Sequence, residues 1–418
     1  MRRLVGIVSI ATALLTAVPA AAQEPQPSSD GDDAAVELAE RHAPIIALKA
    51  QDDACDPDGE PYGPAPVDIV LDNREVVLRQ LGTGNPVVQR APGAADLHGL
   101  GEGFYLDFPG DALDPGCLYE TDFRRFTEQY PPTVYAHVVQ QDDHPDLLAL
   151  QYWIYWYYND WNNKHESDWE GIQLLFEAST VEEALAGEPV SIGYAQHEGG
   201  ERAGWDAAKL ERDGTRPVVY SSAGSHASYF SSAYYLGRSG SEGFGCDTTE
   251  GPSDVIDPEV VVLPDEVTDP ASPLAWLDFA GRWGERQNGP FNGPTGPAAK
   301  DRWLEPVTWH DDLRPSSVII PGGGLANTVT EAFCEVVERG SGALITYTNS
   351  PLRLLLTAVV AVLVGRWLAG RTVWTPGPAT PVRRRRRAGE IIRAAASLYR
   401  REPLELLPFG LVFGPAAV

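Results

Sequence analysis

Seven short segments rich in β-branched and aromatic residues constrain the fold of this chain most strongly. They lie between residues 66 and 222 and are separated by turn-forming residues: PVDIVLD, REVVLRQL, TVYAHVVQ, LLALQYWIYWYY, GIQLLFEA, PVSIGYAQH and RPVVYSS. Such side chains favour pleated strands. Helical patterns are few, namely AAVELAERHAP, TVEEALAG and LAWLDFAGRWG. We therefore expect a mainly β fold, a β-sandwich or a related barrel-like fold with few short helices.

The N-terminus has the features of an export signal. MRRLVGIVSIATALLTAVPAAA combines a basic start, an apolar run and a small-residue end at Ala22. This pattern predicts a secretory signal peptide over residues 1–22, with an uncleaved anchor as the alternative. The polar stretch 23–34 that follows is predicted to be a disordered linker. The β-rich part, residues 35–341, would then be an extracytoplasmic domain.

Four cysteines remain in the exported part: Cys55, Cys117, Cys246 and Cys334. An even number of cysteines in an oxidising compartment predicts two disulfides. Three pairings are possible, and sequence proximity favours Cys55–Cys117 and Cys246–Cys334. A zinc ribbon is not expected, because no CxxC pair is present.

A second apolar segment lies near the C-terminus. Residues 351–370 follow a predicted linker at 342–350 and contain an apolar run bracketed by Arg353 and Arg366; RRRRR follows at 383–387. A polybasic stretch after a membrane span marks the cytoplasmic side. We expect a single-pass type I protein of the cell membrane, and a buried core helix is the alternative. The basic tail, 371–418, can bind anionic lipid, and its hydrophobic end is either the start of a second span or an end in the membrane.

The charge of the chain narrows the range of partners. The formal net charge is −27, and most of the acidic residues lie in the exported part. Such a surface does not attract the phosphates of nucleic acids, so no nucleic-acid partner is expected. Neither a GxxxxGK loop nor a GxGxxG turn after a strand is present, so nucleotide binding has no support.

The heptapeptide KHESDWE, Lys164–Glu170, concentrates residues that bind cations. Asp168 and Glu170 lie two positions apart and share one face of a strand. His165 lies in the preceding loop and can fold back, and Asp160 lies at the other end of that loop. Oxygen ligands with one imidazole suit Mg²⁺, Ca²⁺ or Mn²⁺. The predicted metal ligands are therefore Asp160, His165, Asp168 and Glu170, and a turn with solvated acids is the alternative.

Three further residues are predicted to bind a ligand. Trp169 lies between the two carboxylates, His226 lies in GSHASYF, and His197 lies in the Gly-rich stretch QHEGGERAGWD. His226 can line the cation pocket or act as a general base. Alternatively, it satisfies backbone groups at the end of a strand, and His197 belongs to a solvated loop.

Two motifs carry a family resemblance. The HE-x-DWE segment within KHESDWE, together with RPVVYSSAGSHASYF at 216–230, resembles the vacuolar protein sorting-associated family of fungi, plants and bacteria. The same heptapeptide resembles GHRHDWE of the related necrosis- and ethylene-inducing-like proteins. That resemblance implies a β-sandwich with a divalent cation at its end, held by His165, Asp168, Glu170 and an upstream aspartate. Lys164 and Ser167 replace the toxin motif's Gly and second His, so cytolytic activity is not carried over.

These features lead to three functional hypotheses. The first is a membrane-anchored, non-enzymatic module that binds a glycan or lipid head group through its cation. The resemblance supports this class, because the toxin-like relatives recognise sphingolipid head groups. The second is a metal-dependent hydrolase of an ester, phosphoester or glycoside, with His226 as the acid or base. In the third, the cation only stabilises the fold.

Overall fold

The structure is a computed structural model that describes residues 30–50, 62–197, 199–239, 243–287, 291–321, 325–348 and 350–371, with a few positions between 387 and 400. The chain divides into two compact units, Met1–Pro351 and Leu352–Val418. The signal peptide, most of the predicted linker 23–34, Cys55 and most of the basic tail lie outside the described residues.

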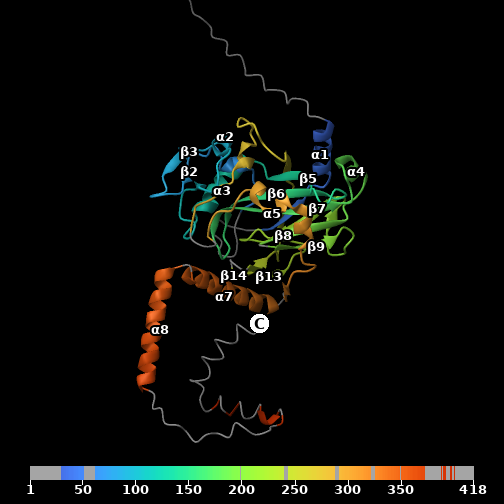
Figure 1. Ribbon diagram of the computed structural model, residues 1–418. Helices are drawn as coiled ribbons and strands as arrows, with labels where there is room; N and C mark the ends of the chain where they lie inside the picture. The colour runs from blue at the N-terminus through green and yellow to red at the C-terminus, as the bar shows by residue number, and fades with distance from the viewer. Residues whose placement is uncertain are drawn as a thin grey trace, which may run out of the picture. The chain divides into compact units, whose positions relative to one another are not determined.

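A six-stranded sheet forms the centre of the first unit (Figure 1). Its middle strands, β6 and β7, are buried at every position, which explains why their sequences are nearly continuous in apolar residues rather than alternating. All neighbours pair antiparallel except β16 and β5, which pair parallel. The strand order is β16 (Glu259–Leu263), β5 (Thr133–Gln140), β6 (Leu148–Asn159), β7 (His165–Phe176), β8 (Ser191–Gln196) and β9 (Gly199–Gly204).

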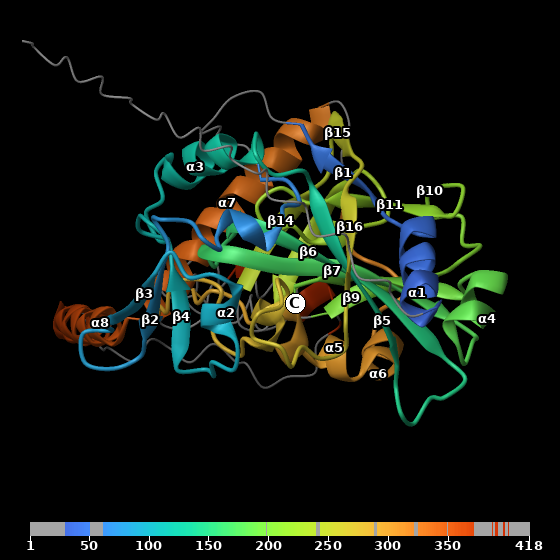
Figure 2. The ribbon, with the colours of Figure 1, turned by 90° about the horizontal axis from the view of Figure 1, so that it is seen from above.

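One face of this sheet packs against a second sheet and α1. The Tyr152 hydroxyl donates to the Ala39 carbonyl of α1, and the Tyr194 hydroxyl donates to the Val218 carbonyl of β11. α4 (Val181–Ala186) lies beside α1 (Asp30–Arg41) in both Figures 1 and 2. The second sheet consists of β10 (Arg212–Asp213), β11 (Arg216–Ser221), β1 (Ile45–Lys49) and β15 (Ser253–Ile256), and β12 (Ser228–Tyr229) also pairs with β11.

The opposite face is covered by a late part of the chain. Two buried glutamines of the central strands hold this layer, because Gln151 donates to the Arg302 carbonyl and Gln173 donates to the Pro306 carbonyl. The expected sandwich is therefore confirmed and has a third layer on its other face. This layer, seen beside β5 and β7 in Figure 2, contains η2 (Ala275–Asp278), η3 (Pro297–Ala299), α5 (Asp301–Leu304) and α6 (Pro306–Asp311).

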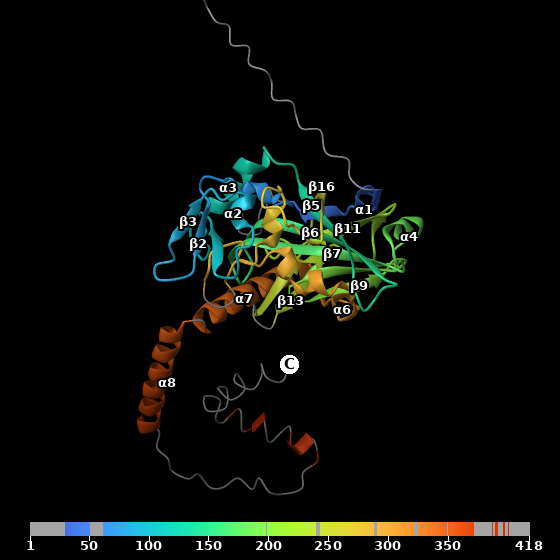
Figure 3. The same cartoon turned by 45° about the horizontal axis from the view of Figure 1, so that its top comes forward.

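Smaller elements complete the first unit. A three-stranded sheet of β3 (Val87–Arg90), β2 (Val77–Gln80) and β4 (Phe104–Asp107) lies near α2 (Ala94–Leu97) and α3 (Leu118–Thr127) (Figure 3). A second three-stranded sheet contains β14 (Gly243–Thr248), β13 (Tyr234–Ser239) and β17 (Ile319–Ile320). α7 (Leu325–Thr348) packs along β14.

One disulfide joins Cys246 of β14 to Cys334 of α7, as sequence proximity predicted. Cys117 is also disulfide-bonded. In the second unit, α8 (Pro351–Arg371) is long and apolar enough to cross a membrane, with a mean hydropathy of 1.9 and no burial by the protein.

The structure differs from several sequence expectations. Residues 30–34 of the predicted linker 23–34 belong to helix α1, and His165, expected in the loop before the strand, is the first residue of β7. PVDIVLD forms the short 3₁₀ helix η1 (Val67–Ile69) rather than a strand, and LAWLDFAGRWG forms only the short 3₁₀ helix η2. The predicted linker at 342–350 is helical as far as Thr348, because α7 is held to β14 and its helical pattern continues through this stretch. The other six predicted strands are present, and several match closely.

Candidate functional site

The KHESDWE motif forms the start of β7, at the hairpin end next to β6. Asp168 pairs with Trp156, and Glu170 pairs with Ile154. Both carboxylates lie on the face that continues into buried Ile172, so the prediction that they share one face of a strand is confirmed. Asp168 and Glu170 are each only 8% exposed. Two acids at such a position are costly unless their charges are offset.

Asp168 is bound to His226 of the GSHASYF motif. The His226 Nδ1 lies 3.1 Å from Asp168 Oδ2, and its ring stacks on Trp156 with 4.3 Å between the centroids. Asp168 Oδ1 accepts the backbone N–H of Trp169 at 2.8 Å. Burial alone raises the pKa of Asp168, but the hydrogen bond and charge of His226 outweigh it and hold the pKa below its usual value. Asp168 is therefore a buried anion.

Glu170 has a different environment from Asp168. Its Oε2 is buried and has no hydrogen-bond partner among the described residues. Burial, followed by the negative charge of Asp168, raises the pKa of Glu170 to about 8. The nearby cations Arg302 and Lys300 oppose this shift only in part. Burial also lowers the pKa of Arg302, to about 10, and its guanidinium stacks on the Trp153 ring.

The remaining predicted ligands, His165 and Asp160, lie at the base of the hairpin loop. His165 is buried, and its Nδ1 lies 2.7 Å from the Ser167 carbonyl oxygen. In the neutral ring this contact places the proton on Nδ1 and the lone pair on Nε2. Asp160 is a third exposed and forms an ion pair with Lys164. The structure therefore places Asp160 at the rim and His165 inside.

The third motif brings His197 to a buried network around Asp247. His197 Nε2 lies 2.8 Å from Asp247 Oδ2, and the hydroxyls of Ser225 and Tyr229 donate to the same carboxylate at 2.6 Å and 2.5 Å. Burial alone raises the pKa of Asp247, but these partners, His197 first, hold it below its usual range. This network adjoins the first one, because Ser225 precedes His226 and the charge of His197 acts on Glu170.

Strained backbone marks the three motifs. Six non-glycine residues in the described part of the chain have a positive φ, and three of them are Ser167 (57°), His197 (54°) and His226 (55°). Such conformations cost free energy and concentrate at functional sites. Each motif therefore contributes one strained residue to the same region.

Trp169 does not join these residues. It lies on the opposite face of β7, is 1% exposed, and packs against the rings of Tyr135, Tyr155, Trp276 and Trp283. Ser167, on the same face, donates to the Trp283 carbonyl. Trp169 thus lies in the aromatic core beneath the third layer.

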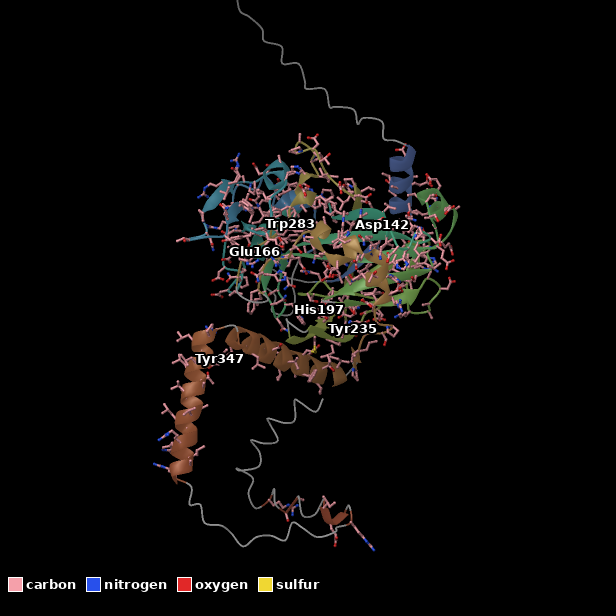
Figure 4. The ribbon with its side chains drawn as sticks, in the orientation of Figure 1. Asp142, Glu166, His197, Tyr235, Trp283 and Tyr347 are labelled. Carbon is pink, nitrogen blue, oxygen red and sulfur yellow. A yellow bond between two sulfur atoms is a disulfide. The ribbon has the colours of Figure 1, made fainter. Side chains whose placement is uncertain are left out.

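A separate acidic triad lies on the other side of the hairpin. Ligand atoms of Asp107, Glu166 and Glu285 all lie within 4.8 Å of one another, so this triad can hold a metal ion. Glu166, labelled in Figure 4 near Trp283, accepts the Phe108 and Glu285 amides and the Tyr119 hydroxyl. Burial, followed by the charge of Asp107, raises its pKa to about 8. Among the described residues, the predicted ligands of KHESDWE are spaced more widely than this triad.

Sequence reasoning missed Asp247 and Arg302. Asp247 follows Cys246 in a short strand and carries no motif of its own, and Arg302 lies in DRWL of α5. Only the three-dimensional packing brings them to the predicted residues. The acidic triad was missed for the same reason, since its members come from β4, β7 and the loop before η3.

Comparison with known proteins supports the predicted family resemblance. Residues 162–288 match the profile of vacuolar protein sorting-associated protein 62, which covers less than half of the chain and includes all three motifs. The resemblance stated from the motifs is therefore confirmed over this segment. No curated protein matches the chain.

Solved structures similar to this chain are necrosis- and ethylene-inducing-like proteins. One is described as NLPPya in complex with mannosamine (14% identity, 58% of this chain, 79% of that chain, TM-score 0.26). Another is described as a toxin fold for microbial attack and plant defence (12%, 57%, 77%, 0.28). A third is Necrosis and Ethylene inducing Protein 2 from the agent of witches' broom disease of cocoa (13%, 58%, 76%, 0.25).

Proposed function

We propose that this chain, whose residues 162–288 are similar to the vacuolar protein sorting-associated protein 62 family, is a membrane-anchored recognition module. Its β domain would hold a divalent cation (Mg²⁺, Ca²⁺ or Mn²⁺) at His165, Asp168 and Glu170, with Asp160 at the rim. The cation and nearby polar groups would bind a glycan or a lipid head group on the extracytoplasmic side. α8 would anchor the domain in the cell membrane.

The environment of the Glu170 carboxylate is the main observation that supports this proposal. A buried carboxylate oxygen without a partner, next to the anion Asp168, costs several kcal/mol unless a positive charge compensates it. The neighbouring Arg302 and Lys300 leave the pKa of Glu170 raised to about 8. A bound divalent cation would supply the missing charge and the missing partner together.

The histidines fit a cation site in their hydrogen bonding. Metal-binding imidazoles usually donate their other ring N–H to a carbonyl or a carboxylate. His165 has this arrangement with the Ser167 carbonyl, and His226 has it with Asp168. The predicted ligand atoms are not all within 4.8 Å of one another, so side chains of the site would move closer together when the cation binds.

Further buried polar atoms support a polar ligand at this place. Trp156 Nε1, Ser228 Oγ and Thr248 Oγ1 are buried and have no hydrogen-bond partner within the described part of the chain. Trp156 stacks on His226, Ser228 follows it by two residues, and Thr248 follows Asp247. Clusters of such atoms in native proteins bind water, ions or ligands.

The burial of His226 favours ligand recognition over hydrolysis as the function of this site. A general base must come within hydrogen-bond reach of its substrate. His226 is 0% exposed and is enclosed between Trp156 and Asp168. Asp160 and Lys164, at the rim, are the exposed charged groups through which a ligand would approach.

Binding to an array of glycans and lipid head groups tests the proposal. The full chain in detergent would be applied with Ca²⁺, Mg²⁺ or Mn²⁺ and, in parallel, with chelator. We expect cation-dependent binding that Asp168→Asn/Glu170→Gln abolishes and that Glu285→Gln, in the separate triad, leaves intact. Cation binding that raises the Tm without any array signal would support a structural cation instead. Release of hydrolysis products would support the hydrolase.

A further inference from the structure

One side of α7 carries an exposed apolar stripe. Its residues recur at intervals of three, four and eight, which places them within roughly 80° of the helix circumference at about 100° per residue. Their exposed fractions lie between 41% and 71%. The stripe consists of Val329, Phe333, Val336, Leu344 and Tyr347.

The orientation of α7 on the domain is fixed by other residues. Cys334 is bonded to Cys246 of β14, and Thr330 donates to the Pro321 carbonyl; both α7 residues are buried. The flank opposite the stripe is charged, with Glu335 and Arg339 forming an exposed i,i+4 ion pair at 2.5 Å. Because the disulfide faces the domain, the stripe cannot turn inward against it.

Only a short stretch of chain connects the end of the stripe to the start of α8. α7 ends at Thr348, and α8 begins at Pro351. Three steps along the chain span at most about 11 Å. α8 is the helix that is long and apolar enough to cross a membrane. If α8 spans a bilayer, Tyr347, which lies four chain steps before Pro351, must therefore be within about 14 Å of the point where the chain enters it. The end of the stripe then lies close to the membrane surface.

We propose that α7 is an interfacial membrane helix whose stripe lies in the headgroup–acyl boundary of the bilayer that α8 crosses. The occupant of this apolar surface is thus lipid, and the proposal rests on the membrane anchoring proposed above. A helix with one apolar side and one charged side lies in this way in the plane of the interface. Tyr347 is an aromatic residue of the kind enriched at that depth.

This placement has a consequence for the domain. α7 packs along β14 (Figures 1 and 2), and Asp247 of β14 holds His197 of the polar site. A stripe seated in the bilayer would fix β14 close to the membrane surface. The domain would then meet ligands of its own membrane in one orientation instead of moving freely on a tether.

Site-directed spin labelling tests this inference on the full chain. No cysteine in the described residues is free, so single-cysteine variants can be labelled without changing the disulfides. Nitroxides at Phe333→Cys, Val336→Cys and Leu344→Cys would be compared with Glu335→Cys on the charged flank. Val360→Cys in α8 reports insertion of the span. The protein is reconstituted in phosphatidylcholine–phosphatidylglycerol nanodiscs, and collisions with oxygen and with a water-soluble nickel chelate are measured.

We expect the oxygen-to-nickel collision ratio at the three stripe positions to exceed that at Glu335→Cys several-fold and to approach that at Val360→Cys. Nickel access at the stripe equal to that at Glu335→Cys, with Val360→Cys in lipid, would overturn the inference while leaving the anchor intact. Shielding of the stripe from both reagents would also overturn it, because a protein surface would then cover α7. Nickel access at Val360→Cys would instead reject the anchoring on which the inference rests.

Discussion

Replacing Glu170 with glutamine should stabilise the metal-free protein. The buried carboxyl has a pKa of about 8 in the fold, against about 4.3 for an unfolded Glu. The folded state therefore binds more protons than the unfolded state between these two pH values, and stability falls as pH rises through that window. Glutamine is neutral at every pH and removes this penalty.

The size of the effect follows from the shift. At pH 7 the folded protein keeps Glu170 protonated nearly three pH units above its unfolded pKa, which costs about 4 kcal/mol at about 1.4 kcal/mol per unit. We expect Glu170→Gln to be more stable than wild type by about 4 kcal/mol at pH 7 in chelator, and the difference to vanish toward pH 4.5. Urea unfolding at a series of pH values measures it.

Glu166→Gln is the matched control on the same strand. Its pKa is raised to the same value of about 8, but its two oxygens accept hydrogen bonds from Tyr119 and from two backbone amides. In Glu166→Gln an amide nitrogen, itself a donor, would replace one oxygen and face these donors. We therefore expect this variant to lose about 1–3 kcal/mol of unfolding free energy. The claim that Glu170 is a buried carboxyl without a partner would be refuted by either of two results. One is equal stability of Glu170→Gln and wild type at pH 7, and the other is a stability difference that does not depend on pH.

Three other predictions concern stability. Removing the Cys246–Cys334 bond by a double substitution with serine frees a loop of 88 residues and should cost about 4–5 kcal/mol by chain entropy, measured by urea unfolding under non-reducing conditions. His310 is buried, and its pKa is lowered to about 4. The free energy of unfolding of wild type should therefore fall by up to about 3 kcal/mol relative to that of His310→Gln as pH falls from 6.5 to 4. The same pH dependence of unfolding in both proteins would contradict this. Gly237→Ala should lower the Tm measurably, because its Cβ would lie 2.9 Å from Asp247 Cγ.

Most strands could be predicted because their residues have a local preference for extended backbone conformation. TVYAHVVQ forms β5 as predicted, since a run of β-branched and aromatic residues with turns at both ends has one low-energy conformation. PVDIVLD has a similar composition but is a 3₁₀ helix, stabilised by the Tyr135 hydroxyl that accepts the Val67 amide. Such a tertiary contact overrides local preference and leaves no sign in the segment itself.

The site could be predicted in part for a related reason. Asp168 and Glu170 share a face because of strand periodicity, which the sequence contains. The sequence predicted that His226 can line the cation pocket, but its contact with Asp168, across 58 positions, could not be derived from spacing. Asp247 and Arg302 come near the site only through the packing of elements that are distant in sequence. No local sequence pattern predicts their position.

Metal content of the purified protein tests the central claim most directly. Elemental analysis of the full chain, after incubation with Ca²⁺, Mg²⁺ and Mn²⁺ and removal of the excess, should find one equivalent of a divalent metal in wild type and in Glu285→Gln, and none in Asp168→Asn/Glu170→Gln. Metal that is lost with Glu285→Gln and retained by the double variant would place the cation at the acidic triad and contradict the account. Absence of metal from wild type would contradict it as well.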